Sequence, residues 1–109
     1  MKVRILGRKG WEDQADFALQ ESLAIVDKMS EVFGYNYCDA FENSECKSDQ
    51  AAIPQFGAGA MENWGLITYR EYYLFIDEER DTYIRKRSAS SIIGENHCKD
   101  QKISIHFIK

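Results

Sequence analysis

Apolar side chains recur at helical spacing most clearly in residues 14–33. The stripe comprises Ala18, Ser22, Ile25, Met29 and Val32, and it is widened by Val26 and Phe33. Asp13 and Asp16 come just before the stripe, as a helix N-cap and a first-turn acid do. Gly34 follows directly and can take the left-handed conformation that ends many helices. The pattern therefore predicts a helix over residues 14–33.

Three shorter stretches have the β-branched, aromatic or alternating pattern of strands. Residues 3–6, VRIL, are the first of them. Residues 50–56, QAAIPQF, are the second, and Pro54 places this strand at a sheet edge or ends it, because proline cannot donate to a central ladder. Residues 65–76, GLITYREYYLFI, are the third and leave room for a bend. The polar, mixed stretch 35–49 predicts a loop.

A second helix is predicted over residues 78–93, with Asp77 as its cap. Its apolar stripe is thin and consists of Ile84, Ser88, Ser91 and Ile92. Residues 94–109 show no helical period, and the alternating segment KISIHFI, 102–108, favours a short strand. The order strand, helix, strand, strand, helix predicts an α+β fold without an internal linker.

The length and charge of the chain narrow the classes of partner. The 109 residues fit one small domain. The net charge of −4 argues against nucleic acid or an anionic membrane as the main partner, since both need a basic face. The basic cluster 85–87 follows several acidic residues, so we interpret it as a solvated helix face.

Targeting signals and cysteines do not identify a compartment. No apolar run approaches the roughly 20 residues that a membrane span needs, and the first residues lack the apolar stretch of a signal peptide. The chain as given is expected to be made in the cytosol. The three cysteines have no Cys-x-x-Cys spacing, which favours free thiols, with a Cys38–Cys46 disulfide as the alternative.

One carboxylate, Glu62, lies within the small and apolar residues of GAGAMENWG, 57–65. A partly desolvated carboxylate is costly unless a cation pairs with it. A protein that acts on amino termini needs such a group to hold the ammonium of its ligand. Gly59 and Ala60 would let a peptide backbone approach closely beside an edge strand. The alternative is a structural salt bridge or a solvated Glu.

Residues 59–65, GAMENWG, resemble the exopeptidase signature of the zinc aminopeptidase family that includes aminopeptidase N (membrane alanyl aminopeptidase). The flanking stretch 47–71 is similar to the family's edge strand, signature loop and following strand. Residues 16–37 resemble the helix that opens its thermolysin-like catalytic domain, and residues 77–93 the helix that leads to the zinc site.

The resemblance implies a domain division and a substrate site. Residues 1–93 would be a partial thermolysin-like (gluzincin) catalytic domain, and residues 94–109 a divergent tail. In the family, the Glu of the signature binds the α-amino group of the substrate. The resemblance therefore implies that Glu62 is the amino-terminus anchor and that the remaining signature residues line the site or shape its turn. These residues are Gly59, Ala60, Met61 and Asn63.

The resemblance also implies zinc in full-length members, held by His-Glu-x-x-His on a helix and by a further Glu. In this chain Glu95, Asn96 and Lys99 stand in place of the first His, the catalytic Glu and the second His. We therefore expect no retained catalytic residue and no zinc bound to this chain. The other candidate ligands, without zinc-site spacing, are His97, Cys98, His106, Cys38 and Cys46.

The sequence thus predicts a fragment of a zinc-dependent aminopeptidase that keeps the amino-terminus site and is inactive alone. The abrupt loss of resemblance after Ile93 favours an alternative or mispredicted exon. One alternative is a non-catalytic peptide-binding or regulatory protein, whose partners would be peptide amino termini or a full-length aminopeptidase. A further alternative is an unrelated α+β structural domain. The compartment of a parent enzyme stays open, because the family includes membrane-anchored and cytosolic members.

Overall fold

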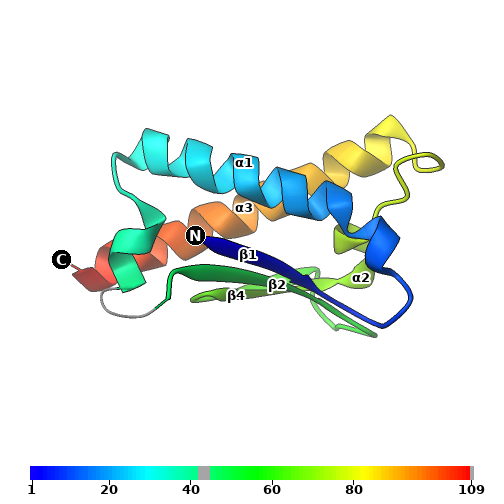
Figure 1. Ribbon diagram of the computed structural model, residues 1–109, viewed down its shortest axis with the longest axis horizontal. Helices are drawn as coiled ribbons and strands as arrows, with labels where there is room; N and C mark the ends of the chain where they lie inside the picture. Colours follow the sequence, from blue (N-terminus) through cyan, green and yellow to red (C-terminus); the bar gives the residue numbers. More distant parts are fainter. Residues whose placement is uncertain (42–44, 109) are drawn as a thin grey trace.

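A computed structural model describes residues 1–41 and 45–108, with side chains described up to residue 100. The chain forms a mixed α/β fold in which helices α1 and α3 lie side by side on one face of a four-stranded sheet (Figure 1). The elements are β1 (Lys2–Leu6), η1 (Glu12–Gln14), α1 (Asp16–Phe33), η2 (Tyr37–Phe41), β2 (Lys47–Ile53), β3 (Ala60–Asn63), β4 (Leu66–Arg70), α2 (Glu71–Leu74) and α3 (Tyr83–Ile108).

The sheet has the strand order β1-β2-β4-β3. Strand β2 runs parallel to both β1 and β4, whereas β3 pairs antiparallel with β4. A tight turn joins β3 to β4, and Gly65 within it has a φ of 72°, which a residue without Cβ adopts at no steric cost. Strand β3 is therefore an edge strand of the sheet.

The strand predictions were right for β1 and partly wrong elsewhere. The second strand is β2, Lys47–Ile53, which starts and ends three residues before the predicted 50–56. Of the two alternatives for Pro54, the end of the strand is right and the edge position is wrong, because β2 is central in the sheet. The first residues of β2 and the 3-10 helix η2 lie within 35–49, so the prediction of a loop there is partly wrong. The third strand stops at Arg70, because α2 follows and buries Leu74 in the core.

The segment 60–63, expected to be a loop, is strand β3. A four-residue strand leaves little periodicity in a sequence, and its pairing with β4 supplies the hydrogen bonds that hold it extended. The sheet therefore contains one strand, β3, that the sequence pattern did not predict.

Helix α1 confirms the prediction for residues 14–33 except in its first turn. It begins at Asp16, and the N-cap position is Ala15 rather than an acidic residue. Gly34 ends the helix in the left-handed conformation, with φ 62° and ψ 28°. The buried positions Ala18, Ser22 and Val26 lie on the predicted stripe.

Helix α3 begins later and ends later than predicted. The Asp77 carboxylate caps a turn by accepting the N–H groups of Glu79 and Arg80. The helix itself starts at Tyr83, where Thr82 Oγ1 accepts the Arg85 N–H at 3.2 Å. It continues to Ile108, so the expected strand over residues 102–108 is wrong.

The sequence of the tail did not predict a helix, because the buried face of α3 is polar there. Ala89 and Ile93 give way to Asn96, His97 and Asp100, all of them 5% exposed or less. Polar residues at buried positions remove the apolar period while the helical backbone persists. None of the described helices combines the length and apolarity needed to cross a membrane.

The core lies between the sheet and the two long helices. Its buried members are Ala18, Ala52, Ile67, Tyr69, Leu74, Phe75 and Ile93. Each layer contributes: Ala18 comes from α1, Ile93 from α3 and Ile67 from β4. The helix-facing side of the sheet is thus closed over most of its area, and the opposite side carries exposed side chains such as Arg4 and Leu66.

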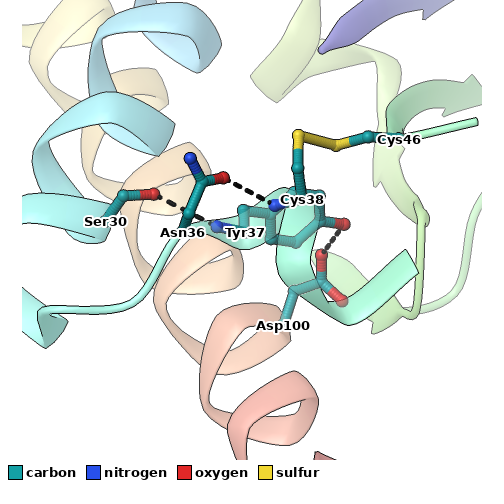
Figure 2. Close-up of a disulfide and its surroundings, with 6 residues drawn as sticks. All are labelled: Ser30, Asn36, Tyr37, Cys38, Cys46 and Asp100. Atoms are coloured by element: carbon teal, nitrogen blue, oxygen red, sulfur yellow. Dashed lines mark hydrogen bonds between the residues drawn. A yellow bond between two sulfur atoms is a disulfide. The ribbon is translucent and has the colours of Figure 1, made fainter. Parts of the chain in front are cut away.

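Cys38 and Cys46 form a disulfide, so free thiols were the wrong prediction for this pair (Figure 2). Their Cα atoms lie 5.1 Å apart, a normal separation for a disulfide. The disulfide joins η2 to the residue before β2, and the Tyr37 hydroxyl beside it donates to Asp100 Oδ2 of α3 at 2.7 Å. Cys98 is a free thiol.

Candidate functional site

Four of the five predicted site residues lie on β3 and divide between the two faces of the sheet, and the fifth, Gly59, directly precedes this strand. Glu62 lies opposite Ile67, and Ala60 opposite Tyr69, in the antiparallel register of β3 and β4. Directly opposed residues share a face, and both β4 residues are fully buried beneath the helices. Glu62 and Ala60 therefore face α3. Met61 and Asn63 face the other way and are exposed.

Glu62 lies among ionisable groups of α3 and β4. Burial raises the pKa of Asp100 to about 6; its bond from Tyr37 lowers the pKa, and the negative charge of Glu62 raises it. The Lys99 pKa is raised first by the bond to Glu95 and also by Glu62. Burial, with smaller effects of Asp100 and Glu62, raises the pKa of Tyr69. The charge of the carboxylate that the sequence singled out therefore acts on two groups of α3 and one of β4.

Arg70 holds the chain that leads into the signature. Its Nε donates to the carbonyls of Phe56 at 3.1 Å and Ala58 at 2.9 Å, and its Nη2 donates to the Gly57 carbonyl at 3.1 Å. The Arg70 backbone N–H also donates to the Gly59 carbonyl at 3.0 Å. Residues 56–59 are therefore tied to the end of β4, although the GAGA stretch 57–60 predicts a flexible segment.

Sequence reasoning missed Arg70, although a signal existed. An arginine placed just after an apolar strand and close to a glycine-rich segment can satisfy several carbonyls with its planar fork of donors. A pocket of about 320 Å³ adjoins this arginine. Its lining comprises Ile53, Gln55, Phe56, Arg70, Glu71 and Tyr72.

The outer edge of β3 is open in the part of the chain that the structure describes. β3 pairs with β4 along one side and is the last strand in the sheet order. An exposed strand edge presents backbone N–H and C=O groups that an extended peptide can pair with. A ligand added there would lie beside Glu62 and Ala60 on one face and beside Met61 and Asn63 on the other.

The aromatic residue of the signature joins β3 to η2. The Trp64 ring meets Phe41 edge to face with centroids 5.9 Å apart, and Phe41 meets Tyr37 at 5.2 Å. Tyr37 in turn bonds Asp100 of α3. The Trp64 end of the signature is thus linked to α3 through η2, whose Tyr37 meets Asp100 of this helix (Figure 2).

The residues that the resemblance places at His-Glu-x-x-His, which are Glu95, Asn96 and Lys99, have partners within α3. The Lys99 ammonium pairs with the Glu95 carboxylate at 2.8 Å, one helical turn away. Asn96 donates from its side-chain amide to the Ile92 carbonyl at 2.8 Å. A protonated lysine has no lone pair for a metal, and zinc sites in proteins use Cys, His, Asp and Glu.

The remaining candidate ligands lie apart. His97 is 2% exposed, burial lowers its pKa to about 4, and its Nε2 has no hydrogen-bond partner among the described residues. Cys38 and Cys46 are joined to each other. The side chain of His106 lies outside the described residues. Among the side chains that are described, no three His, Cys, Asp or Glu gather as metal ligands.

Comparison with known proteins finds one family across most of the chain. The pattern of the peptidase family M1 domain matches residues 17–97. The chain is 42% identical over 81 residues to the membrane alanyl aminopeptidase of Heliothis virescens, covering 74% of this chain and 8% of that protein. It is 38% identical over 94 residues to aminopeptidase M1 of Arabidopsis thaliana, covering 86% of this chain and 10% of the relative.

A third relative is the endoplasmic reticulum aminopeptidase 1 of Mus musculus. It is 43% identical over 94 residues, which cover 86% of this chain and 9% of the relative. The chain thus spans about a tenth of the length of the relatives that it matches. The matched residues include β3, the Arg70 contacts and the first half of α3.

Proposed function

Since this chain belongs to the peptidase M1 family, we propose that it is the part of a zinc-dependent aminopeptidase that holds the amino terminus of the substrate. One observation carries the proposal: Glu62 lies on an edge strand and faces α3, beside a peptide-sized open edge. The relatives are named as aminopeptidases, and that activity is the one in which a fixed amino terminus matters.

Binding would combine one charge with one strand edge. The Glu62 carboxylate would accept hydrogen bonds from the α-ammonium of a peptide, and charge-assisted bonds of this kind are stronger than neutral ones. The backbone of the peptide would pair with the free edge of β3, where Ala60 and Gly59 present no large side chain. Arg70 would support the site by holding residues 56–59 in place.

Hydrolysis is not part of the function that we propose for this chain by itself. The family draws on zinc for its chemistry, and the residues at positions 95, 96 and 99 do not form its ligand set. Neither an amide nor an ammonium can act as the general base. A carboxylate that binds the ground state without a nucleophile accelerates no chemical step.

A titration with a tripeptide amide tests the proposed binding. Trialanine amide should bind the 109-residue chain, and N-acetyl-trialanine amide, which lacks the ammonium, should not. Glu62→Gln should weaken binding by roughly tenfold or more, because it removes a charge-assisted bond. Glu31→Gln, a change of an exposed carboxylate on α1, is the matched control and should leave binding unchanged. Equal binding of both peptides would exclude the proposal.

An activity assay tests the proposed absence of hydrolysis. The purified chain with added zinc and an aminoacyl fluorogenic substrate should give no turnover. Turnover that both a chelator and Glu62→Ala abolish would show that the tail builds a metal site after all. Binding and turnover are measured on the same preparation, so a failure to fold is recognised by circular dichroism before either result is interpreted.

A further inference from the structure

The 3-10 helix η2 contacts the turn that closes the signature. The Phe41 ring meets the Trp64 ring edge to face, with centroids 5.9 Å apart. The same ring lies over the next residue, because a Cβ placed on Gly65 would lie 3.6 Å from Phe41 Cε1. Gly65 is the residue of positive φ between β3 and β4. A contact at this turn therefore bears on the position of the strand that carries Glu62.

The Cys38–Cys46 disulfide joins the two segments that contact this turn (Figure 2). Cys38 lies in η2 together with Phe41. Cys46 directly precedes Lys47 of β2, and the Lys47 ammonium donates to the Gly65 carbonyl at 3.5 Å. The sulfur bridge therefore ties together one segment that packs on the turn and one that is hydrogen-bonded to it.

We propose that this disulfide is a redox control of the amino-terminus site, with Phe41 as the positioning residue that connects the two. The oxidised chain holds η2 on the Trp64–Gly65 turn, whereas the reduced chain releases it and binds peptide amino termini more weakly. The inference rests on the proposed function, because the site that it regulates is the one at Glu62.

The redox step needs a dithiol as reductant. Cys38 and Cys46 are both half-buried, so a small dithiol can reach their sulfur atoms. Its attack breaks the S–S bond, the two cysteines take up two electrons and two protons, and the reductant becomes a cyclic disulfide. The Tyr37 bond to Asp100 contains no sulfur and remains, so the release is confined to the part of η2 that contacts the turn.

Titration with trialanine amide, before and after treatment with dithiothreitol, tests the inference. Reduction should weaken binding by between about twofold and tenfold, the range that one edge-to-face ring pair supplies. The double variant Cys38→Ser, Cys46→Ser should bind as the reduced chain does and should not respond to the reductant. Cys98→Ser, which changes the free thiol, is the matched control and should keep the full response.

Phe41→Leu tests the route from the disulfide to the site. It keeps the sulfur bridge and removes the ring pair, so the oxidised variant should bind as weakly as the reduced parent chain, and dithiothreitol should add little. An affinity equal to that of the oxidised parent would contradict this route. Fluorescence gives a readout without peptide: in Trp11→Phe, Trp64 is the only tryptophan, and reduction should move its emission to longer wavelength as the ring gains water.

The outcomes separate the inference from the function on which it rests. Unchanged, Glu62-dependent binding after complete reduction would overturn the inference and leave the proposed function standing. Unfolding on reduction, measured by circular dichroism, would also overturn it, because the disulfide would then support the whole fold rather than the site. Absence of binding by the folded, oxidised chain would overturn both.

Discussion

Glu62 and Arg70 lie on opposite faces of one hairpin. Glu62 shares the helix-facing side with Ile67, and Arg70 extends from the end of β4 on the other side. In the proposed function the first would supply a charge to a ligand, whereas the second donates hydrogen bonds to the chain itself. A site of this kind depends on both, because a carboxylate anchor is useful only if the backbone around it keeps its position.

Arg70→Lys should destabilise the chain by about 1 kcal/mol and weaken binding of trialanine amide. Lysine keeps the charge but cannot reach the carbonyls of Phe56, Gly57 and Ala58 with one planar group. Denaturant unfolding measures the first effect and calorimetric titration the second. The exposed Arg87→Lys is the matched control, expected within about 0.5 kcal/mol of the parent chain. An unchanged affinity and stability would show that Arg70 does not hold residues 56–59.

At the scale of elements, helix α3 links several parts of the fold. It packs on α1 and β3, and on η2 through the Tyr37–Asp100 bond. Its sequence contains Gly94 in mid-helix, where glycine is costly because the unfolded chain has more freedom to lose. Gly34 occurs instead at the end of α1, where a positive φ needs glycine.

The two glycines predict opposite effects of the same substitution. Gly94→Ala should raise the free energy of unfolding by about 0.5–1 kcal/mol, since the new Cβ would lie at an ordinary 3.7 Å from Ile25 Cδ1. Gly34→Ala should lower it by about 1 kcal/mol, because its φ of 62° strains an L-residue. Guanidinium midpoints at constant m-value measure both. A destabilised Gly94→Ala would contradict a continuous helix α3 at this point.

At the scale of the whole molecule, the buried groups Asp100 and His97 change the free energy of unfolding in opposite directions as pH rises. Burial raises the pKa of Asp100 to about 6 and lowers that of His97 to about 4. Between pH 4 and 6 the native chain holds more protons at Asp100 than the unfolded chain, so this group makes stability fall as pH rises. At His97 the unfolded chain holds more protons, so stability rises with pH over about the same window.

The parent chain should therefore show a nearly flat free energy of unfolding between about pH 4.5 and 6. Asp100→Asn keeps an acceptor for Tyr37 and leaves only His97, so stability should rise with pH by up to about 1.4 kcal/mol per unit. His97→Gln leaves only Asp100 and should reverse the sign of that slope. Urea unfolding at four pH values measures the slopes. Equal slopes in the two variants would show that these groups do not titrate as their burial requires.

Several features could be read from the sequence because they depend on neighbours in the chain. Helix α1 and its end at Gly34 follow from the apolar stripe and the glycine, and the end of β2 follows from Pro54. The family follows from the signature and its flanks, which are contiguous in sequence. Glu62 was singled out for the same local reason, as one carboxylate among small and apolar residues.

Other features depend on contacts between distant residues and were decided only by tertiary structure. Strand β3 is extended because it pairs with β4. Helix α3 continues past Ile93, where polar side chains such as Asn96 and His97 are buried against the rest of the fold. Cys38 pairs with Cys46 in a segment whose Tyr37 is hydrogen-bonded to Asp100 of α3. The surroundings of β3, on which Glu62 lies, include helix α3, which contacts this strand in space but lies far from it in sequence. Side-chain type and spacing are local properties, whereas pairing, burial and electrostatic neighbours are properties of the assembled fold.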